Sequence, residues 1–386
     1  MTLSKRERVF KTLELDGEPD MVPIHYFGLE QTGSSFQAFI KSGEREKYQR
    51  WVISTFSNKK YYLTEPRFWN VDLWGMDPFG ETKIKIRYKD APPEYPNCRL
   101  NTMDGRLYQT VKQVNTGLEY AWYVGGFFKT PEILHEYWDG HGKPTELIND
   151  RIKYNPQVWE GFVEAVAPYF YPMANLPLNP SEVLIGGINF NRFAYYIRKN
   201  PQFIHEVMDE YTKVNIEIIN RLAEAGVDIV TFGDDLGYKE NQFFSLKVFR
   251  EFILPYHKRI YQACKKNSML VVLHSCGKVD PFLPDLVDIG LNCIQSLEAT
   301  AGVNLAYLKE TLGDRLCFMG GLDSSGILTY GTPEDVVENV KYSIKVAGQG
   351  GGYFVGPSHD IINIPWENIM AMRAAIEKYR KYPLKL

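Results

Sequence analysis

The C-terminal half of the chain contains the run Met269-Leu270-Val271-Val272-Leu273-His274-Ser275-Cys276-Gly277. Its first part is short and aliphatic and follows a polar break, a pattern typical of a buried strand in a parallel sheet. His274 and Cys276 follow where this strand ends, and residues i and i+2 of an extended segment point the same way. We therefore expect the imidazole and the thiol to meet at one point and to bind a divalent metal, above all zinc. The alternative is a buried thiol and a hydrogen-bonded histidine beside a tight glycine turn.

The segments around this run alternate regularly between strand and helix patterns after residue 150. The expected strands are 182–188, 227–233, 269–274, 292–297, 315–319 and 352–355. The expected helices are 201–225, 245–266, 281–289, 304–312, 333–346 and 365–379. Strict alternation predicts a parallel sheet, and two earlier strands bring the total to about eight. At 386 residues, this count favours an α/β fold of the (β/α)8 TIM-barrel class over an open doubly wound sheet.

The N-terminal third of the chain follows a different pattern. The elements expected first are a helix at 4–15, a strand at 21–27 and a weaker helix at 36–57. Between about residues 71 and 128, apolar and polar residues alternate in segments such as 84–88 and 107–114, which predicts antiparallel hairpins. Thr130 and Pro131 have the residue types of a helix start. We expect one barrel domain over residues 1–386, with a β-rich hairpin insertion at about 71–128.

The composition excludes several classes of protein. A net charge of −3 implies no strongly basic face, so we expect no nucleic-acid partner. The start of the chain is charged and does not resemble a secretory signal, and no apolar run approaches the length of a membrane span. The five cysteines are scattered and odd in number, which favours reduced thiols and a cytoplasmic location. Dinucleotide-binding and phosphate-loop glycine motifs are absent from the sequence.

The carboxyl ends of the expected strands carry the candidate functional residues, because active sites of such barrels lie at that face. The candidate catalytic residues are Asp234, Asp235, Glu298 and His359. The candidate cofactor-binding residues are His25, Gly320, Gly321 and Asp323. Each has a structural alternative: the acids as caps or turn residues, the glycines as points of close packing, and His359 as a hydrogen-bonded loop histidine. Their convergence on one face favours function.

Several segments together resemble the uroporphyrinogen decarboxylase superfamily. They are Pro19-Asp20-Met21-Val22-Pro23, Phe249-Arg250-Glu251-Phe252-Ile253-Leu254-Pro255, His274-Ser275-Cys276-Gly277, Phe318-Met319-Gly320-Gly321-Leu322-Asp323 and Gly331-Thr332-Pro333-Glu334-Asp335-Val336. The resemblance covers most of the chain and is strongest from about residue 180 onward. It implies a (β/α)8 barrel, in agreement with the strand count.

The superfamily has two branches, and the resemblance favours the second. True decarboxylases carry an arginine-rich segment after the first strand, whereas residues 25–32 contain no arginine here. Cobalamin-linked methyltransferases, such as the methylcobamide:coenzyme M type, resemble the chain in the His-x-Cys segment, which holds two zinc ligands. Their third ligand is a cysteine in the loop after the last strand, where His359 stands here. The resemblance therefore implies His274, Cys276 and His359 as zinc ligands, with donor atoms within about 4 Å of one another.

The function that this resemblance implies is a zinc-dependent methyltransferase. It moves a methyl group between a corrinoid, carried by a partner protein, and a thiol or similar acceptor. Asp234, Asp235 or Glu298 then orients a ligand histidine or binds a polar end of the substrate. The first alternative is a metal-free decarboxylase, with His359 or Asp234 as the acid. The second is a non-catalytic corrinoid- or tetrapyrrole-binding protein. A homodimer is a further expectation, since members of the superfamily often pair.

Overall fold

The computed structural model describes residues 2–26, 28–76, 78–79, 88–112, 119–148 and 154–385. Its centre is a sheet with the strand order β13-β12-β11-β10-β9-β8-β3, and all neighbouring pairs in it are parallel. The strands are β3 (Leu73–Gly75), β8 (Tyr171–Asn175), β9 (Ile229–Gly233), β10 (Leu270–Ser275), β11 (Cys293–Ser296), β12 (Cys317–Leu322) and β13 (Tyr353–Pro357).

The sheet is closed by the segment around Ile24 and His25. Ile24 forms a parallel bridge to Val355 of β13, and His25 forms one to Leu73 of β3. The His25 N–H donates to the Val355 carbonyl at 3.1 Å, and the Asp72 N–H donates to the Ile24 carbonyl at 2.9 Å. This short eighth strand lies between the two edges of the sheet, so the (β/α)8 TIM-barrel class predicted from the sequence is confirmed.

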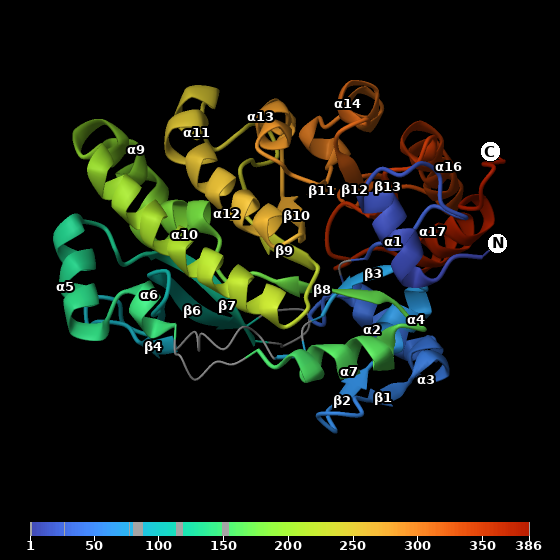
Figure 1. Cartoon of the computed structure of the whole chain (residues 1–386), viewed down its shortest axis with the longest axis horizontal. Helices are drawn as coiled ribbons and strands as arrows, with labels where there is room; N and C mark the ends of the chain where they lie inside the picture. Colours follow the sequence, from blue (N-terminus) through green and yellow to red (C-terminus); the bar gives the residue numbers. More distant parts are fainter. Residues whose placement is uncertain are drawn as a thin grey trace.

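Helices follow the strands in turn and cover the outside of the barrel (Figure 1). After β8 come α8 (Pro180–Glu182), the π-helix η1 (Val183–Asn189), α9 (Phe190–Lys199) and α10 (Pro201–Glu224). The helices from β9 to β11 are α11 (Leu246–Phe252), α12 (Leu254–Lys266), η2 (Asp280–Phe282) and α13 (Leu283–Asp288). The remaining ones are η3 (Ala299–Ala301), α14 (Leu305–Leu312), α15 (Ile327–Tyr330), α16 (Pro333–Ser343), η4 (Ile344–Gly348) and α17 (Trp366–Tyr379). Within the described ranges, no helix has both the length and the apolar character needed to cross a bilayer.

The barrel has two apolar cores because strand residues alternate between its two faces. Val271 and Leu273 of β10 belong to the larger core, between the strands and the outer helices. Val272, between them, belongs to a smaller core inside the barrel. Val9 and Leu13 of α1 (Lys5–Leu13) pack into this smaller core. Helix α1 therefore plugs the amino-terminal end of the barrel, and the carboxyl end is left for a site.

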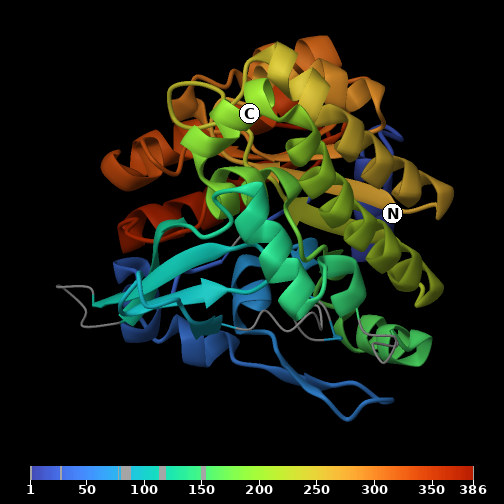
Figure 2. The same ribbon diagram turned by 90° about the vertical axis from the view of Figure 1, so that its left-hand side faces the viewer.

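An antiparallel sheet of four strands is inserted between β3 and the next helices, with the order β4-β5-β6-β7. Its strands are β4 (Tyr88–Asp90), β5 (Cys98–Asn101), β6 (Arg106–Lys112) and β7 (Glu119–Gly126). Figure 2 shows this sheet and the β1–β2 hairpin in the lower half of the molecule. The other elements of the N-terminal part are α2 (Ser34–Lys41), α3 (Glu44–Tyr48), β1 (Trp51–Ile53), β2 (Lys60–Tyr62), α4 (Thr64–Trp69), α5 (Pro131–His141), α6 (Pro144–Leu147) and α7 (Pro156–Val166). Most of the segment expected at 84–88 and the end of that at 107–114 lie outside the described residues.

Several predicted elements are corrected by the structure. The expected strand 182–188 is helical, forming the end of α8 and most of η1, because a buried apolar run does not distinguish a strand from a buried helix. The true strand there is β8, earlier in the chain. Strand β3 also belongs to the barrel, so the inserted sheet begins at β4 rather than near residue 71. The expected helix 36–57 ends at Tyr48, and the expected helix 245–266 is divided into α11 and α12.

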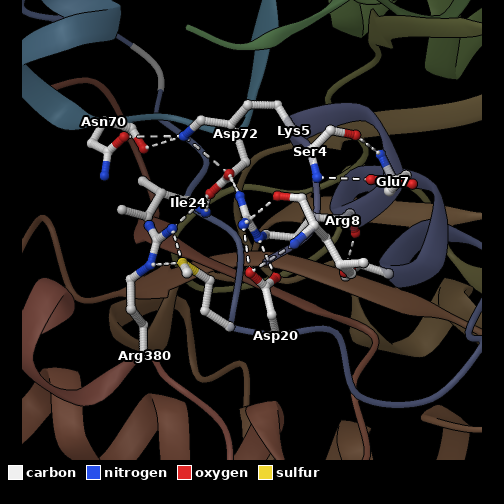
Figure 3. A network of polar contacts seen from close by, with 12 residues as sticks. Ser4, Lys5, Glu7, Arg8, Asp20, Ile24, Asn70, Asp72 and Arg380 are labelled. Carbon is white, nitrogen blue, oxygen red and sulfur yellow. Dashed lines mark hydrogen bonds and ion pairs between the residues drawn. The ribbon is translucent and has the colours of Figure 1, made fainter. Parts of the chain in front are cut away.

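The amino-terminal end of the barrel is held by a network of charges around Asp72, which is fully buried before β3 (Figure 3). Its Oδ1 accepts hydrogen bonds from Arg8 at 2.6 Å and pairs with Lys5 at 3.1 Å. Its Oδ2 accepts from the Ile24 N–H at 2.8 Å and pairs with Arg380 at 3.3 Å. One carboxylate thus ties together helix α1, the closing strand and the segment after α17.

Candidate metal centre and cavity

Three metal-binding side chains meet at the carboxyl end of the barrel: Asp235, which follows β9, and His274 and Cys276, at the end of β10. The Cys276 Sγ lies 3.2 Å from His274 Nε2, and His274 Nε2 lies 3.7 Å from Asp235 Oδ1. One donor atom of each residue lies within 4.8 Å of those of the other two. The expected convergence of His274 and Cys276 is therefore present.

These three residues fit a zinc ion. Ligands at 2.0 to 2.3 Å in a tetrahedron lie about 3.3 to 3.8 Å from one another, close to the distances seen here. His274 Nδ1 hydrogen-bonds the side-chain carbonyl of Gln295, so Nδ1 carries the proton and Nε2 presents a lone pair toward Cys276 and Asp235. Carboxylate, imidazole and thiolate are all zinc ligands, and three protein ligands with an open fourth position are typical of catalytic zinc.

The surroundings of Cys276 keep its thiol protonated unless a cation binds to it. Burial raises the pKa of the Cys276 thiol, and the carboxylates of Asp235 and Glu298 raise it further. The thiol is therefore protonated at neutral pH in the absence of a cation. A coordinated dication stabilises the thiolate instead, so the site that disfavours a free thiolate is suited to a metal-bound one.

Backbone contacts fix the loop that carries Cys276. The Cys276 N–H donates to Asp235 Oδ1 at 2.8 Å, and the Gly277 N–H donates to Glu298 Oε1 at 2.9 Å. Gly277 has a φ of +75°, and a Cβ there would lie 2.5 Å from the Tyr238 nitrogen. Only glycine fits this turn without a backbone shift. Glu298 thus supports the loop rather than joining the close donor group.

A cavity of about 330 Å³ adjoins the donor group. His274 belongs to both, and Gln295 and His25 line the cavity beside it. His25 is buried, and burial, together with nearby His274, lowers its pKa to about 3, so the ring is neutral. His25 therefore lines the cavity, and its expected role in cofactor binding stays a prediction. The rest of the wall comes from β3, from β9, and from β8 and the loop after it.

Asp234 has a structural environment that differs from that of Asp235. Its carboxylate is fully buried and accepts hydrogen bonds from the Ser181 N–H at 3.0 Å and the Ser181 hydroxyl at 2.7 Å. It also contacts His257 Nε2 at 2.7 Å, and the other ring nitrogen of His257 contacts the Tyr261 hydroxyl at 3.2 Å. This network joins α8 and α12 to the end of β9. Asp234 is therefore in a position to hold Asp235 in place.

The glycines and the acid of β12 have local structural roles. Gly320 and Gly321 have φ values of +102° and +85°, and a Cβ on Gly320 would lie 2.7 Å from the Ser296 carbonyl. The Asp323 carboxylate accepts from the backbone N–H groups of Gly326 at 2.9 Å and Ile327 at 3.2 Å, at the start of α15. In the structure, these residues serve close packing and helix capping. Their expected role in cofactor binding stays a prediction.

The position of His359 corrects the expected ligand set. His359 follows β13, and its Nδ1 accepts a hydrogen bond from the Asp360 N–H at 2.9 Å. Among the described residues, the group of metal-binding side chains within 4.8 Å contains Asp235 and not His359. The expectation that His359 completes a cluster within 4 Å is therefore not met. Asp235 is supplied by the strand adjacent to β10, so its loop needs no movement to reach the other two donors.

Several side chains that form the cavity wall were not predicted from the sequence. Gln295 orients His274, and it is a polar residue that follows the apolar Cys293 and Ile294 in β11. Asn175 and Asn179 line the cavity, but they were missed because β8 itself was not recognised. Trp74 was assigned to the insertion rather than to β3.

Comparisons with known proteins agree with this geometry. The family model described as uroporphyrinogen decarboxylase (URO-D) matches residues 180–379. A methylcobamide:CoM methyltransferase of Methanosarcina barkeri is 29% identical over 62% of this chain and 68% of its own length. A methylated-thiol–coenzyme M methyltransferase of Methanosarcina mazei is 26% identical over 52% of this chain and 50% of its own length. A uroporphyrinogen decarboxylase of Chlorobium phaeovibrioides is 26% identical over 42% of this chain and 45% of its own length.

A solved structure titled as a methyltransferase from Methanosarcina mazei matches over the whole fold. It covers 98% of this chain and 99% of that chain, with a TM-score of 0.61 and 19% identity. This likeness shows a shared barrel architecture. The resemblance predicted from the sequence motifs is confirmed, and the methyltransferases among the relatives match more of the chain than the decarboxylase does.

Proposed function

The chain belongs to the uroporphyrinogen decarboxylase family, and from this premise we propose that it is a zinc-dependent methyltransferase of that family. It transfers a methyl group between a corrinoid, carried by a partner protein, and an acceptor such as a thiol. The observation that carries the proposal is the group of Asp235, His274 and Cys276 at the carboxyl mouth of a (β/α)8 barrel. The names of the similar methyltransferases support the same reaction class.

Each residue of the centre has a defined task in this proposal. Asp235, His274 and Cys276 would hold zinc, which, when bound, supplies the positive charge that keeps a substrate thiol deprotonated. Gln295 holds His274 in the tautomer that offers Nε2. Glu298 holds the Gly277 backbone and so fixes the Cys276 loop. The adjoining cavity binds and orients the rest of the substrate and limits the access of water.

The three ligands also determine the net charge of the metal centre. With Asp235 and Cys276 as anionic ligands and His274 neutral, the ligands balance the charge of a dication. The ligand set expected from the sequence, with His359, carries one negative charge fewer. A site of balanced charge withdraws less electron density from a bound thiolate, which favours its attack on a methyl carbon. When a methylated corrinoid is bound, its methyl group would pass to the sulfur, and the electron pair of the broken bond would stay with the corrinoid.

The alternative, decarboxylation of a porphyrinogen, has less support from the cavity. Its lining residues, as far as the structure describes them, include no lysine or arginine that could pair with several carboxylates. Asp234, an acid considered for that mechanism, is buried and already hydrogen-bonded to Ser181 and His257. A protein that only bound a tetrapyrrole would not need the three metal-binding side chains Asp235, His274 and Cys276. We expect no useful conversion of uroporphyrinogen by the purified protein.

The proposal is tested by metal content and by methyl transfer. The purified protein should bind about one zinc per chain and transfer methyl groups between methylcobalamin and a thiol. Cys276→Ala should lose both. The matched control is Cys98→Ala, because Cys98 lies in β5 of the inserted sheet. Full activity of Cys276→Ala, with Cys98→Ala also active, would exclude the metal mechanism.

The same proposal leads to expectations about the partner protein and about the cellular location. The corrinoid carrier would approach the carboxyl mouth, where the donor group lies. All five cysteines are free, which suits the reducing cytoplasm expected from the sequence. A homodimer stays a prediction, to be checked by light scattering of the purified protein.

A further inference from the structure

The cavity beside the donor group has a wall without fixed charge. The residues that line it, among those that the structure describes, include no Lys, Arg, Asp or Glu. Apolar residues in the lining include Tyr26, Trp74, Met173 and Val272, and the last two belong to the core inside the barrel. Tyr26 is buried and lies 5.5 Å from Trp74, ring centre to ring centre, in a tilted arrangement. A ligand with a flat or apolar body therefore finds matching surface here.

The cavity also offers one hydrogen-bond donor that the protein does not use. Gln295 is 2% exposed, and its carbonyl oxygen is engaged by His274 Nδ1. Its Nε2 is buried and has no hydrogen-bond partner among the described residues. A buried donor without an acceptor costs about 1–3 kcal/mol unless a ligand or water supplies one. The wall thus favours a ligand with an acceptor atom that reaches Gln295.

The surroundings of the cavity oppose a second negative charge. Asp235 lies 3.7 Å from His274, and Glu298 lies behind the Cys276 loop. Asp360, which follows β13, is close enough to His274 for an electrostatic interaction. With Asp235 and Cys276 as anionic ligands, a bound dication is already balanced. It leaves no excess positive charge for an anionic group of the substrate.

The partly buried arginine of the inserted sheet, Arg106, is already engaged. Arg106 of β6 pairs with Asp104 at 2.6 Å and with Glu182 at 3.1 Å. It therefore faces two carboxylates and carries no spare charge for a ligand. A sulfonate or carboxylate in the cavity would lose its hydration without an ion-pair partner, and such a loss is costly.

From these observations we propose that the cavity binds an uncharged substrate, with an apolar or aromatic body and a neutral hydrogen-bond acceptor, rather than an anionic thiol such as coenzyme M. The proposal deepens the proposed function, on which it rests for the reaction, by naming the class of acceptor. It separates this chain from relatives named for coenzyme M. The specificity-determining feature is the neutral wall that contains Asn175, Asn179 and Gln295.

The test compares thiols with and without a sulfonate group. Calorimetry on the zinc-loaded protein should be run with phenylmethanethiol and its para-sulfonate, and with mercaptoethanol and mercaptoethanesulfonate, which is coenzyme M. In each pair, we expect the uncharged thiol to bind at least about tenfold more tightly. Equal or tighter binding of the sulfonates would overturn the proposal.

A gain-of-function variant makes the test independent of folding defects. Asn175 is exposed at the cavity mouth, so it accepts a longer side chain. Asn175→Lys should raise the affinity for mercaptoethanesulfonate at least about fivefold, because it adds the missing cation. Asn175→Gln adds length without charge, so the difference in affinity between the lysine and glutamine variants measures the effect of the charge alone. If the lysine has no effect while the protein remains folded, the charge argument is wrong.

A third comparison separates this proposal from the proposed function. Phenylmethanol and its para-sulfonate need no metal, so they can be compared on metal-free protein. A preference for the alcohol supports the neutral cavity even if zinc content and methyl transfer fail. A preference for the sulfonate overturns it even if methyl transfer succeeds.

Discussion

The pKa values of carboxyl groups shift in opposite directions at the two ends of the barrel. At the amino-terminal end, burial by itself would raise the pKa of Asp72, but Arg380, Lys5 and Arg8 hold it below its usual value. Asp20, which pairs with Arg8 at 2.8 Å, also has a lowered pKa: burial raises it, but the hydrogen bond and charge of Arg8, together with the Leu3 N–H, outweigh burial. Figure 3 shows Asp72 among Lys5, Arg8 and Arg380, with Asp20 beside Arg8.

At the carboxyl end, burial is not outweighed by cations. Burial raises the pKa of Glu182 to about 7, and Asp234 and Asp235 add to this rise against the opposing effect of Arg106. The pKa of Asp360 is also raised, first by burial. Arg106, which pairs with Glu182, does not reverse the effect of burial there. The charge network at the amino-terminal end stabilises the fold, whereas the acids at the carboxyl end are available for a ligand.

The largest expected effect comes from breaking the amino-terminal network. Asp72→Asn keeps the shape of the side chain but leaves Lys5, Arg8 and Arg380 facing one another, so the free energy of unfolding should fall by about 3–5 kcal/mol. Urea denaturation of the metal-free protein measures it. Asp288→Asn is the control, because its pair with Arg315 is exposed and should contribute less than about 1 kcal/mol. An equal effect of both variants would refute the distinction.

The second effect is the pH dependence of stability at the carboxyl end. Glu182 has a pKa of about 7 in the folded protein against a usual 4.5, so the folded state binds its proton more tightly. Its contribution to stability is therefore full below about pH 4.5 and is lost as the pH rises to about 7, by at most about 3 kcal/mol. Glu182→Gln should remove this slope in urea titrations across that range. The amino-terminal acids have the opposite sign: their contribution is lost as the pH falls. An unchanged slope in the variant would contradict the assignment.

The third effect distinguishes the two possible third ligands. Asp235→Ala should weaken zinc binding by about a hundredfold, or about 2.7 kcal/mol, because a direct ligand is lost. His359→Ala is the matched control and should change zinc affinity by less than about threefold. Competition with a chelator measures both. If His359→Ala had the larger effect, the ligand set expected from the sequence would be restored.

The smallest effect concerns the orientation of His274. Gln295→Leu removes the carbonyl that fixes the tautomer and should weaken zinc binding by about tenfold, or about 1.4 kcal/mol. The unfolding free energy of the metal-free protein should change little, because the unpartnered Nε2 disappears as well. Zinc affinity identical to that of the unaltered chain would mean that His274 is held by its backbone alone.

The sequence predicted the second half of the barrel well, because each of its strands is an apolar run followed by a clear helix. It also predicted His274 and Cys276, since i and i+2 of one strand must face the same way. It failed where an apolar run was ambiguous, as at η1, and where a strand was short, as at β3. Pro23, which has no N–H to donate, interrupts the closing strand. Its pairing is therefore limited to isolated bridges around Ile24.

The third member of the donor group illustrates what spacing alone cannot supply. Asp234 and Asp235 are adjacent and chemically identical, so the sequence pattern does not distinguish their roles. In the structure, Asp234 binds Ser181 and His257, while Asp235 reaches Cys276. Which acid faces inward depends on where β9 ends, and a shift of one residue exchanges their roles.

The charge network around Asp72 also has a consequence for the order in which the chain folds during synthesis. One carboxylate binds residues as far apart in the sequence as Lys5 and Arg380, and Ile24 pairs with β13. Neither contact exists until nearly the whole chain has left the ribosome. The nascent protein must therefore carry an open sheet with two unpaired edges until β13 has emerged, a period in which those edges are exposed to other chains.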